Sequence, residues 1–415
     1  MILHVVGAHA TATGRPTRPN TGAQMDYGDG TRSVWAGEDG PMWERSTQVP
    51  IVQSVSFGYQ DIDEWMAVAL GEEPGHIYSR NTNPTVAVLE ARVADLERAE
   101  AATSFATGMA AISASLYTLL APGSRVVSVK DTYGGTSKLF LDFLPALNVD
   151  VALCDTDDHD AIEEEISKGC DVVYLETPTN PTLKVLDIER LAQAGHAVGA
   201  TVIVDNTFAT PINQRPLLLG ADLVVHSATK FLGGHADALG GIACGGSELV
   251  ERIFGYREIN GATLSPFSAY LLLRSIKTLH LRIERQNDNA MAIAKHLSSH
   301  PGVDSVFYPG LPDHPGHEVA ARQMSGFGGV LSFSIVGGFD MVKQVLPRLR
   351  LAHLAANLGA VETIAGPPVT TSHVETSAAE RKALGIPENL VRYSCGVEDV
   401  EDLIADLDQA LSIVG

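Results

Sequence analysis

The sequence predicts an α/β fold with a mostly parallel central sheet, followed by a smaller α+β domain at the C-terminus. Short β-branched runs alternate with helical stretches through the middle of the chain, which is the pattern of a parallel sheet with helices on both faces. After Gly241 this pattern gives way to longer helices and an alternating strand. The length of 415 residues exceeds one ordinary core, so two or three domains are expected.

The first 45 residues are rich in Gly, Thr, Pro and Asp and show no periodicity, which predicts an extended arm that is partly disordered at its start. Apolar residues then recur at helical spacing over residues 86–101, and a second helix is expected over 109–121. The strands expected next, separated by helices such as 188–200, cover residues 125–130, 149–154, 171–176, 201–205 and 222–226.

The C-terminal part has a different pattern. Residues 268–297 are expected to form one or two long helices, 328–337 a half-buried antiparallel strand, and 400–411 an amphipathic helix. The predicted organisation is an N-terminal arm over residues 1–70, a large α/β domain over 71–272 and a C-terminal α+β domain over 273–415.

The composition excludes several classes of protein. A formal net charge of −21 and a pI near 5.0 argue against a nucleic-acid partner, whose phosphates would be repelled. No apolar stretch approaches the roughly 20 residues of a membrane helix, and the start lacks the basic region of a signal peptide. The four cysteines form no CxxC pair, which fits reduced thiols rather than disulfides or a zinc site. We therefore expect a cytoplasmic protein without a membrane partner.

The segment HSATKFLGGHADALGG, residues 226–241, places a lysine just after a predicted strand. Ligands of α/β sheets bind beyond the carboxyl ends of the strands, so Lys230 lies where a Schiff base could form. Ser227 and Thr229 could offer hydroxyl groups to a phosphate. On this segment alone an ordinary surface lysine is an equally good interpretation. A dinucleotide-binding loop is disfavoured, because these glycines lead into a strand rather than opening a helix.

Asp205 ends the predicted strand TVIVD, 25 residues before Lys230. A lone aspartate there would most simply cap the next helix. The intervening length covers one helix and one strand, so both side chains could emerge at the same sheet edge. A pyridoxal 5′-phosphate (PLP) cofactor needs this pair, because a carboxylate keeps the pyridine nitrogen protonated and the ring able to accept electrons.

A turn of small residues opens the predicted helix within ATGMAAISASL, residues 106–116. The backbone N–H groups of Gly108 and Met109 would face an anion, and the helix dipole would add to the attraction. Helix starts with a nearby glycine are common, so this pattern indicates a phosphate site only in combination with the other two.

Seven segments in order resemble the Cys/Met-metabolism family of PLP enzymes, which includes cystathionine γ-synthase, cystathionine γ-lyase, methionine γ-lyase and O-acylhomoserine sulfhydrylase. The resemblance implies the aspartate-aminotransferase-like type I fold of PLP-dependent transferases, with PLP as cofactor. It also implies self-association as a homodimer or as a homotetramer built from tight dimers. The matching segments are IYSRNTNPT (77–85), SFATGMAAI (104–112), DTYGGT (131–136), ETPTNPTLKVLDI (176–188), VDNTFATP (204–211), HSATKFLGGHADALGG (226–241) and LVRYSCGVED (390–399).

The resemblance implies a role for each matching residue. Lys230 would form the Schiff base and move protons between the substrate carbons and the leaving group, and Asp205 would pair with the pyridine nitrogen. Tyr133 would stack on the cofactor ring. Arg392 would clamp the α-carboxylate of a small amino-acid substrate through a bidentate pair, with Asn180 near that carboxylate and the phenolic oxygen of the cofactor. The phosphate would be held by Gly108, Met109, Ser227 and Thr229, and by Tyr78 and Arg80 of the neighbouring subunit, to whose active site the N-terminal arm would contribute.

Each of these residues also has a purely structural alternative. Tyr133 could be a core aromatic, Arg392 part of a surface ion pair, and the Tyr78–Arg80 stretch a loop with an incidental charge. His314 and His317 in PDHPGH are read as structural, because the remaining ligands of a metal site are missing. No metal is expected.

Three departures from the family patterns bear on the reaction. Methionine γ-lyases typically place a cysteine where Gly135 stands, whereas Asp237 matches the GHxD of the cystathionine enzymes. Ala356 stands where cystathionine γ-synthases and γ-lyases usually carry a glutamate that meets the distal ammonium of the substrate, and Ala356-Asn357 is similar to the sulfhydrylases. We therefore expect poor turnover of cystathionine and a substrate without a distal ammonium–carboxylate pair.

The reaction implied is γ-elimination or γ-replacement on a homoserine- or homocysteine-type amino acid, as in transsulfuration. Candidate substrates are O-acylhomoserines, homocysteine, or an oxygen-linked amino acid such as canavanine. The alternative is an O-acetyl- or O-succinylhomoserine sulfhydrylase, and methionine γ-lyase or β-elimination as in cystathionine β-lyase is less favoured. The joint presence of Lys230, Asp205, Tyr133 and Arg392 disfavours a non-enzymatic scaffold, and the lack of GxGxxG at a strand-to-helix turn disfavours a nicotinamide dehydrogenase.

Overall fold

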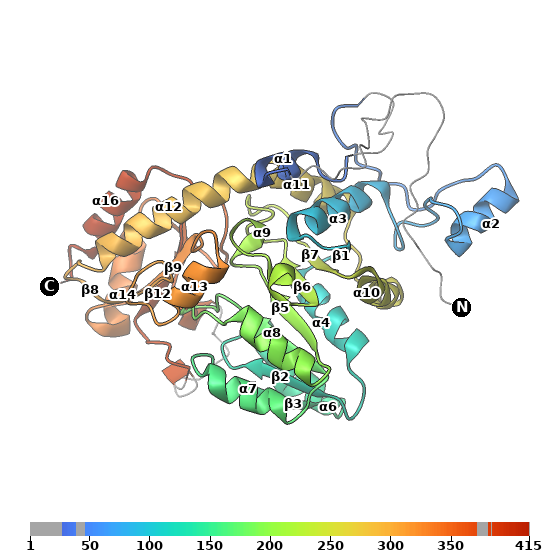
Figure 1. Ribbon diagram of the computed structural model, residues 1–415. Coiled ribbons are helices and arrows are strands. Elements are labelled where there is room, and N and C mark those ends of the chain that lie inside the picture. The colour runs from blue at the N-terminus through green and yellow to red at the C-terminus, as the bar shows by residue number, and fades with distance from the viewer. Residues whose placement is uncertain (1–26, 39–45, 372–380, 383, 415) are drawn as a thin grey trace.

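The computed structural model describes residues 27–38, 46–371, 381–382 and 384–414. The described chain builds two sheets, one of seven strands and one of five, joined by long helices across the molecule (Figure 1). The predicted order of a mostly parallel sheet followed by a smaller α+β unit is confirmed. The exact limits of the three domains stay a prediction.

The seven-stranded sheet has the order β1-β7-β6-β5-β4-β2-β3. Neighbouring strands from β6 to β3 pair in parallel, whereas β7 pairs antiparallel with both β6 and β1. All five strands predicted between residues 125 and 226 lie in this sheet, within a residue or two of the expected ends. The strands are β1 (Ala101–Phe105), β2 (Arg125–Val129), β3 (Asp150–Cys154), β4 (Val172–Glu176), β5 (Thr201–Asp205), β6 (Leu223–Ser227) and β7 (Gly241–Gly245).

Helices cover both faces of this sheet, because its strands are apolar on both sides. Along β5, Val202 and Val204 pack with α7 and α8, whereas Ile203 faces the opposite layer with α4 and α10. The covering helices are α4 (Gly108–Leu119), α7 (His159–Ser167), α8 (Ile188–Ala197) and α10 (Ser247–Asn260), with the shorter α5 (Gly134–Lys138), α6 (Leu144–Ala146) and α9 (Thr210–Asn213) in the connections.

The five-stranded sheet has the order β10-β11-β12-β9-β8 and is antiparallel except between β10 and β11. The expected half-buried strand over 328–337 is wrong in its exposure: all six residues of β9 are buried. One face carries Leu331 and Phe333 into the C-terminal core, and on the other Ser332 donates to the backbone oxygen of Pro181, in the connection between β4 and α8. The strands are β8 (Val303–Phe307), β9 (Val330–Ile335), β10 (His353–Leu354), β11 (Ile364–Gly366) and β12 (Leu390–Ser394).

The predicted pair of long helices separates into α11 and α12, and the amphipathic helix over 400–411 is confirmed as α16. Helix α12 runs along the C-terminal sheet (Figure 1) and packs on α16. The helices of this part are α11 (Pro266–Ile276), α12 (Leu279–Leu297), α13 (His317–Gln323), α14 (Gly338–Val345) and α16 (Val400–Leu411).

The N-terminal region differs from the extended arm that was expected. Residues 29–35 form helix α1, which packs on α3 and α12, and the remaining expectation for residues 1–26 and 39–45 lies outside the described residues. The helix predicted over 86–101 ends earlier, because the chain turns at Arg98 in the left-handed conformation and continues as β1. Helix α2 buries none of its residues and stands away from the body (Figure 1). These helices are α1 (Asp29–Trp35), α2 (Ile62–Leu70) and α3 (Pro84–Glu97).

None of the helices in the described ranges combines the length and apolar character of a membrane span. The largest apolar clusters instead lie between helices and the two sheets.

Candidate active site

Three polar residues end three neighbouring parallel strands of the large sheet. Glu176, Asp205 and Ser227 are the last residues of β4, β5 and β6, and Glu176 and Asp205 are direct partners in the register. Carboxyl ends of parallel strands meet at one sheet edge, where α/β proteins bind ligands. Lys230 lies in the turn just after β6, so the structure brings Lys230 and Asp205 to the same edge, as expected from the sequence.

Lys230 and Arg392 are linked by Asn357, a residue that was not predicted from the sequence to lie in the site. Lys230 Nζ donates to Asn357 Oδ1 at 2.9 Å, and Arg392 Nη2 donates to the backbone oxygen of Asn357 at 3.1 Å. Arg392 Nη1 donates to Asn180 Oδ1 at 2.9 Å. A residue from a loop beside the C-terminal sheet thus joins the lysine of the large sheet to the arginine of β12.

Arg392 is buried and Lys230 is partly buried, and neither cation makes an ion pair within the ranges that the structure describes. Burial and the nearby positive charge of Arg392 lower the pKa of Lys230 to about 8. Burial also lowers the pKa of the Arg392 guanidinium to about 10. Two shielded cations whose described partners are amide oxygens form a site for an anionic ligand, since an uncompensated buried charge is otherwise costly.

Asp205 is buried and held by donors on both carboxylate oxygens. Its Oδ1 accepts from the backbone N–H of Thr207 at 3.0 Å, and the hydroxyl of Tyr174 donates to Oδ2 at 3.4 Å. Burial raises the pKa of Asp205, whereas the bonds from Thr207 and the nearby His226 act in the opposite direction. Burial and the charge of Asp205 raise the pKa of Glu176 well above its usual range. Both acids of this adjacent pair accept hydrogen bonds, since Glu176 Oε2 accepts from the Tyr133 N–H, but the upward shift of the pKa is larger for Glu176.

The N-terminus of α4 and the end of β6 make a close-fitting cradle. A Cβ atom at Gly108 would lie 2.7 Å from the Cβ of Ser227 and 2.9 Å from its hydroxyl oxygen, so only glycine allows this approach. Thr107 caps the helix by accepting from Ala110 N–H. The start of α4, whose first amides belong to Gly108 and Met109, therefore lies close to the Ser227 hydroxyl, which is an arrangement that suits a phosphate. Thr229, two residues on, exchanges hydrogen bonds with Gly240.

Tyr133 lies next to this cradle with its ring half exposed. Its backbone N–H donates to Glu176 Oε2 at 2.7 Å, which fixes the start of α5 against β4. A Cβ atom at Gly135 would come within 2.9 Å of both the Tyr133 ring and the Met109 sulfur, so Tyr133 and Met109 are neighbours. An aromatic face is thus available beside Met109, at the start of the helix that forms the phosphate cradle.

These residues fit PLP. Lys230 offers an amine of lowered pKa to an aldehyde, Asp205 offers a buried carboxylate to a pyridinium, and the Gly108 cradle offers helix amides and a hydroxyl to a phosphate. A cavity of about 380 Å³ adjoins Lys230, and Thr229, Asn357 and Ala356 also line it, together with the loop from Ala236 to Leu239.

Tyr78 and Arg80 lie elsewhere in the chain. Arg80 donates to the backbone oxygen of Glu258 on α10 at 2.5 Å, and its guanidinium lies 5.7 Å from the centre of the Tyr78 ring. The Tyr78 ring is 43% exposed. The structure does not bring these two residues into the chain of contacts that joins Lys230, Asn357 and Arg392.

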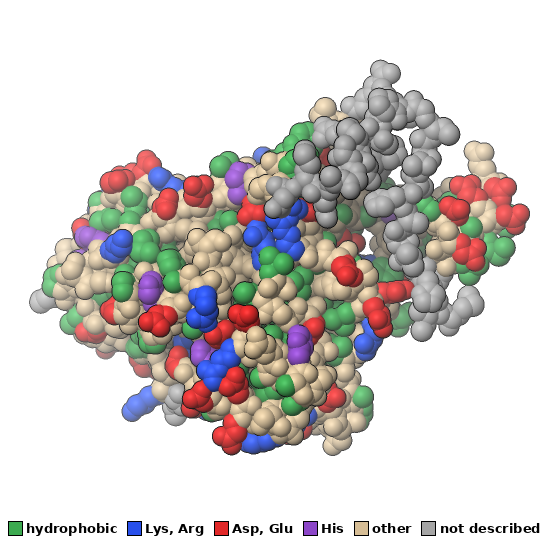
Figure 2. Space-filling view, in the orientation of Figure 1, with side chains coloured by type: hydrophobic (Ala, Val, Ile, Leu, Met, Phe, Trp, Pro, Cys, Tyr) green, Lys and Arg blue, Asp and Glu red, His purple; other side chains and the backbone are tan. Residues whose placement is uncertain are grey.

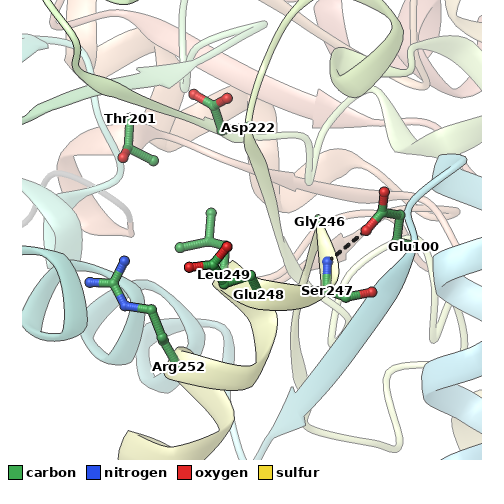
Figure 3. Close-up of a pocket in the computed structure, with 8 residues that line it drawn as sticks. All are labelled: Glu100, Thr201, Asp222, Gly246, Ser247, Glu248, Leu249 and Arg252. Atoms are coloured by element: carbon green, nitrogen blue, oxygen red, sulfur yellow. Dashed lines mark hydrogen bonds between the residues drawn. The ribbon is translucent and has the colours of Figure 1, made fainter. Parts of the chain in front are cut away.

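Two other groups of residues lie apart from this site. A hollow of about 410 Å³ lies at the opposite edge of the large sheet, where Thr201 begins β5 and Asp222 precedes β6 (Figure 3). His314 accepts from the Gly316 N–H, and His317 bonds to the backbone oxygen of Pro309. No cluster of three potential metal ligands occurs among the described residues.

Comparisons with known proteins point to one family. The family model described as "Cys/Met metabolism PLP-dependent enzyme" matches residues 30–412. An L-methionine gamma-lyase of Fusobacterium nucleatum subsp. polymorphum is 43% identical over 388 residues, covering 93% of this chain and 98% of the relative. A cystathionine gamma-synthase of Mycobacterium leprae (strain TN) is 41% identical, covering 92% and 96%. The crystal structure of cystathionine gamma synthase from Xanthomonas oryzae pv. oryzae with aminoacrylate and cysteine superposes with a TM-score of 0.88 at 36% identity, covering 93% and 98%.

Proposed function

Because the chain belongs to the Cys/Met-metabolism family of PLP-dependent enzymes, we propose that it catalyses γ-elimination or γ-replacement on a homoserine- or homocysteine-type amino acid. The type I fold and the PLP cofactor expected from the sequence are confirmed by the family match and the structural similarity. Relatives named for γ-lyase and γ-synthase activities support chemistry at the γ-carbon.

One observation supports this proposal most directly: Arg392 is buried, lacks an ion pair among the described residues, and is joined to Lys230 through Asn357. An α-carboxylate bound by this guanidinium would place the α-carbon of an amino acid within reach of Lys230. Asn180 holds one side of the guanidinium and leaves its other donors for a bidentate pair.

Each residue of the chain then has a physical task. PLP, when bound, supplies an electron sink for negative charge on the substrate carbons. Asp205 would hold the pyridine nitrogen protonated, and the Tyr133 ring would keep the heterocycle flat against the sheet edge. Lys230 would take the α-proton and later deliver a proton to the leaving group, a task for which a pKa lowered to about 8 is suited near neutral pH.

The cavity beside Lys230 limits the γ-substituent. Ala356 lines this cavity at a position where cystathionine γ-synthases and γ-lyases usually carry a glutamate. The described cavity wall therefore presents a methyl group at this point. A distal ammonium would find no carboxylate at position 356, and the carboxylate among the described lining residues is Asp237, on the loop after Lys230. We therefore propose an O-acylhomoserine, homocysteine or an oxygen-linked amino acid such as canavanine as substrate, rather than cystathionine.

A second candidate is an O-acetyl- or O-succinylhomoserine sulfhydrylase. Asn357 favours it, because the Ala-Asn pair resembles those enzymes and the asparagine contacts Lys230 directly. This candidate uses the same cofactor-binding residues and narrows the reaction to γ-replacement on an O-acylhomoserine, with sulfide as the entering nucleophile.

We also propose that the active site is completed in a homodimer. Helix α2 presents Ile62, Trp65 and Met66 to solvent, exposed by 78%, 49% and 54%, so this helix has no core of its own. Figure 2 shows hydrophobic and acidic side chains together on this projecting part. A partner subunit would cover the apolar side chains and place its own Tyr78 and Arg80 near the phosphate cradle.

A substrate panel tests the reaction. O-acylhomoserines, homocysteine, canavanine, methionine and cystathionine would each be supplied with and without a thiol, and the products identified. Formation of 2-oxobutanoate or of a thioether supports γ-chemistry, and pyruvate would indicate β-elimination instead. Turnover of cystathionine as fast as that of the best substrate would contradict the role given to Ala356.

Mixing inactive subunits tests the shared site. Lys230→Ala and Arg80→Ala chains, each inactive alone, should regain activity when co-expressed, because a hybrid dimer contains one site with both residues intact. No recovered activity in a hybrid of confirmed composition would mean that Arg80 serves only its own chain.

A further inference from the structure

We propose that Glu97 is a positioning residue, which fixes the spacing between the two ends of the cofactor site, Asp205 and Ser227. The inference rests on the roles proposed for these two residues. Glu97 is the last residue of α3 and contacts neither of them directly. It acts through their neighbours in the chain, Asn206 and His226.

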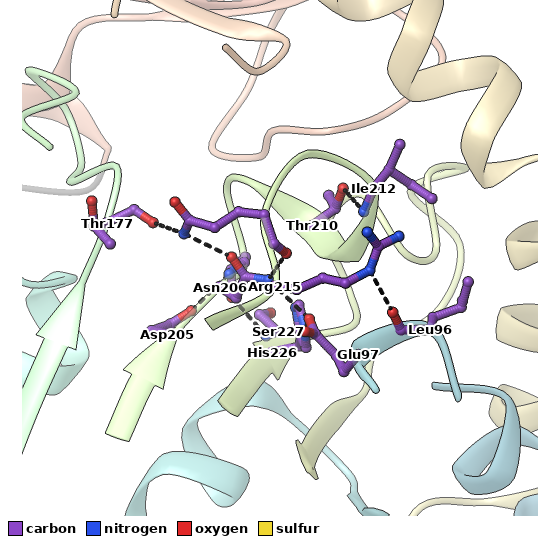
Figure 4. A network of polar contacts seen from close by, with 12 residues as sticks. Leu96, Glu97, Thr177, Asp205, Asn206, Thr210, Ile212, Arg215, His226 and Ser227 are labelled. Carbon is purple, nitrogen blue, oxygen red and sulfur yellow. Dashed lines mark hydrogen bonds and ion pairs between the residues drawn. The ribbon is translucent and has the colours of Figure 1, made fainter. Parts of the chain in front are cut away.

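One buried carboxylate oxygen joins the ends of two strands. Glu97 Oε1 accepts from Asn206 Nδ2 at 2.8 Å and lies 2.5 Å from His226 Nε2. Asn206 directly follows Asp205 at the end of β5, and His226 directly precedes Ser227 at the end of β6. Figure 4 shows Glu97 reaching both residues from beneath the sheet edge.

The network extends to the third strand of the site. Gln214 Nε2 donates to Asn206 Oδ1 at 3.1 Å and to the backbone oxygen of Thr177 at 3.2 Å, and Thr177 directly follows Glu176. Asn206 Nδ2 also donates to the backbone oxygen of Gln214 at 2.9 Å. The ends of β4, β5 and β6 are therefore held by one set of buried side chains (Figure 4).

The buried position of Glu97 lowers the free energy of unfolding. Its side chain has no solvent exposure, and its Oε2 atom has no hydrogen-bond partner among the described residues. It also lies at the C-terminus of a helix, where the helix dipole disfavours a negative charge. The backbones of β5 and β6 are already joined by the bond from Asn206 N–H to Val225 O. Holding the strands together thus does not require Glu97, whereas orienting the residues around Asp205 and Ser227 does.

The same network bears on the charge of Asp205. His226 is held by Glu97 and is close enough to Asp205 to lower the pKa of that carboxyl. The other titratable groups facing Asp205 are Tyr174 and Glu176 on β4: the hydroxyl of Tyr174 donates to the carboxylate and lowers the pKa of Asp205, whereas Asp205 and Glu176 oppose each other's ionisation. Glu97 therefore positions both a strand end and a basic side chain beside Asp205.

Glu97→Gln is the decisive variant, because it keeps the size and one oxygen of the side chain and removes its charge. In the purified holoenzyme we expect PLP to be lost roughly tenfold faster or more on dilution, and the circular-dichroism band of bound PLP in the visible range to change in amplitude. His226→Gln, which keeps a donor near the Nε2 position, should retain both signals better than His226→Leu.

Asp406→Asn is the matched control. Asp406 is a buried carboxylate on α16 that accepts from the backbone N–H groups of Arg350 and Leu351, far from the sheet edge. Its variant should lose stability without changing PLP release or the visible band. If Glu97→Gln and the His226 variants lower the melting temperature as Asp406→Asn does while PLP release stays within twofold of wild type, the proposal is wrong. These readouts require PLP binding only, so they stand whichever substrate the panel identifies.

Discussion

The buried charged side chains at the edges of the two sheets that meet at the active site differ in their hydrogen-bond partners. At the edge of the large sheet, buried acids are held by hydrogen-bond donors of the chain itself: Asp205 by Thr207 and Tyr174, and Glu97 by Asn206 and His226. At the edge of the small sheet, Arg392 is buried with amide oxygens as its only described partners. The buried acids of the cofactor side therefore have their hydrogen-bond partners within the chain, whereas on the substrate side the buried charge of Arg392 is neutralised only when an anion binds.

Lys230→Ala should have the largest effect, because it removes the group that joins the two sides. We expect no measurable turnover and loss of the yellow band near ~420 nm that marks lysine-bound PLP, with an unchanged far-ultraviolet spectrum. Borohydride reduction followed by peptide mapping should label Lys230 in the wild-type enzyme. A label on another lysine would contradict the assignment.

Arg392→Ala should weaken substrate binding by about 2–5 kcal/mol, since a buried charge-assisted pair is lost. The effect should appear mainly in KM, while PLP stays bound, because Arg392 makes no contact with Asp205 or with the Gly108 cradle in the described hydrogen bonds. Arg392→Lys should be intermediate, because it keeps the charge and loses the bidentate geometry. Arg190→Ala, which breaks ion pairs at the surface, serves as the control. An unchanged KM in Arg392→Ala would contradict the assignment of Arg392 to the substrate carboxylate.

Asn357 connects the cofactor side to the substrate side, because it accepts hydrogen bonds from both Lys230 and Arg392. Asn357→Ala should lower kcat by roughly tenfold, through loss of one hydrogen bond to a charged group. Asn357→Asp should place an anion between the two cations and raise the pKa of Lys230 above its value of about 8. The rate at which the apoenzyme captures PLP should therefore rise with a midpoint near pH 8 in the wild type and at a higher pH in Asn357→Asp. Coincident profiles would contradict the contact.

The smallest expected effect concerns stability. Burial lowers the pKa of Lys230 from its usual 10.5 to about 8, so the protonated side chain disfavours folding. This penalty is complete below pH 8 and fades as the pH rises toward 10.5, where the unfolded chain also loses its proton. Lys230→Met should therefore raise the melting temperature of the apoenzyme at pH 7 by about 2–4 °C, and the gain should shrink near pH 10. A gain independent of pH would point to better packing instead.

The sequence predicted the cofactor side better than the rest of the molecule. Asp205 and Lys230 follow buried strands of a parallel sheet, so their positions at one edge come from the topology alone. Asn357 and Glu97 lie in a loop and at a helix end, and reach the site through contacts 109 to 129 residues apart in the chain. Such contacts leave no periodic signal. Strand β1 was missed for another reason: its small residues AATSF lack β-branched character apart from one threonine.

The crowding around Gly135 determines which related active sites can be reached from this one by single substitutions. A side chain at this position would meet the Tyr133 ring and the Met109 sulfur at 2.9 Å. The sulfur ends a flexible side chain and can move, whereas the ring is anchored through its backbone to Glu176. A cysteine at position 135 is therefore accommodated only if the Tyr133 ring shifts, because a smaller residue at position 109 would remove the contact with the sulfur and leave the contact with the ring.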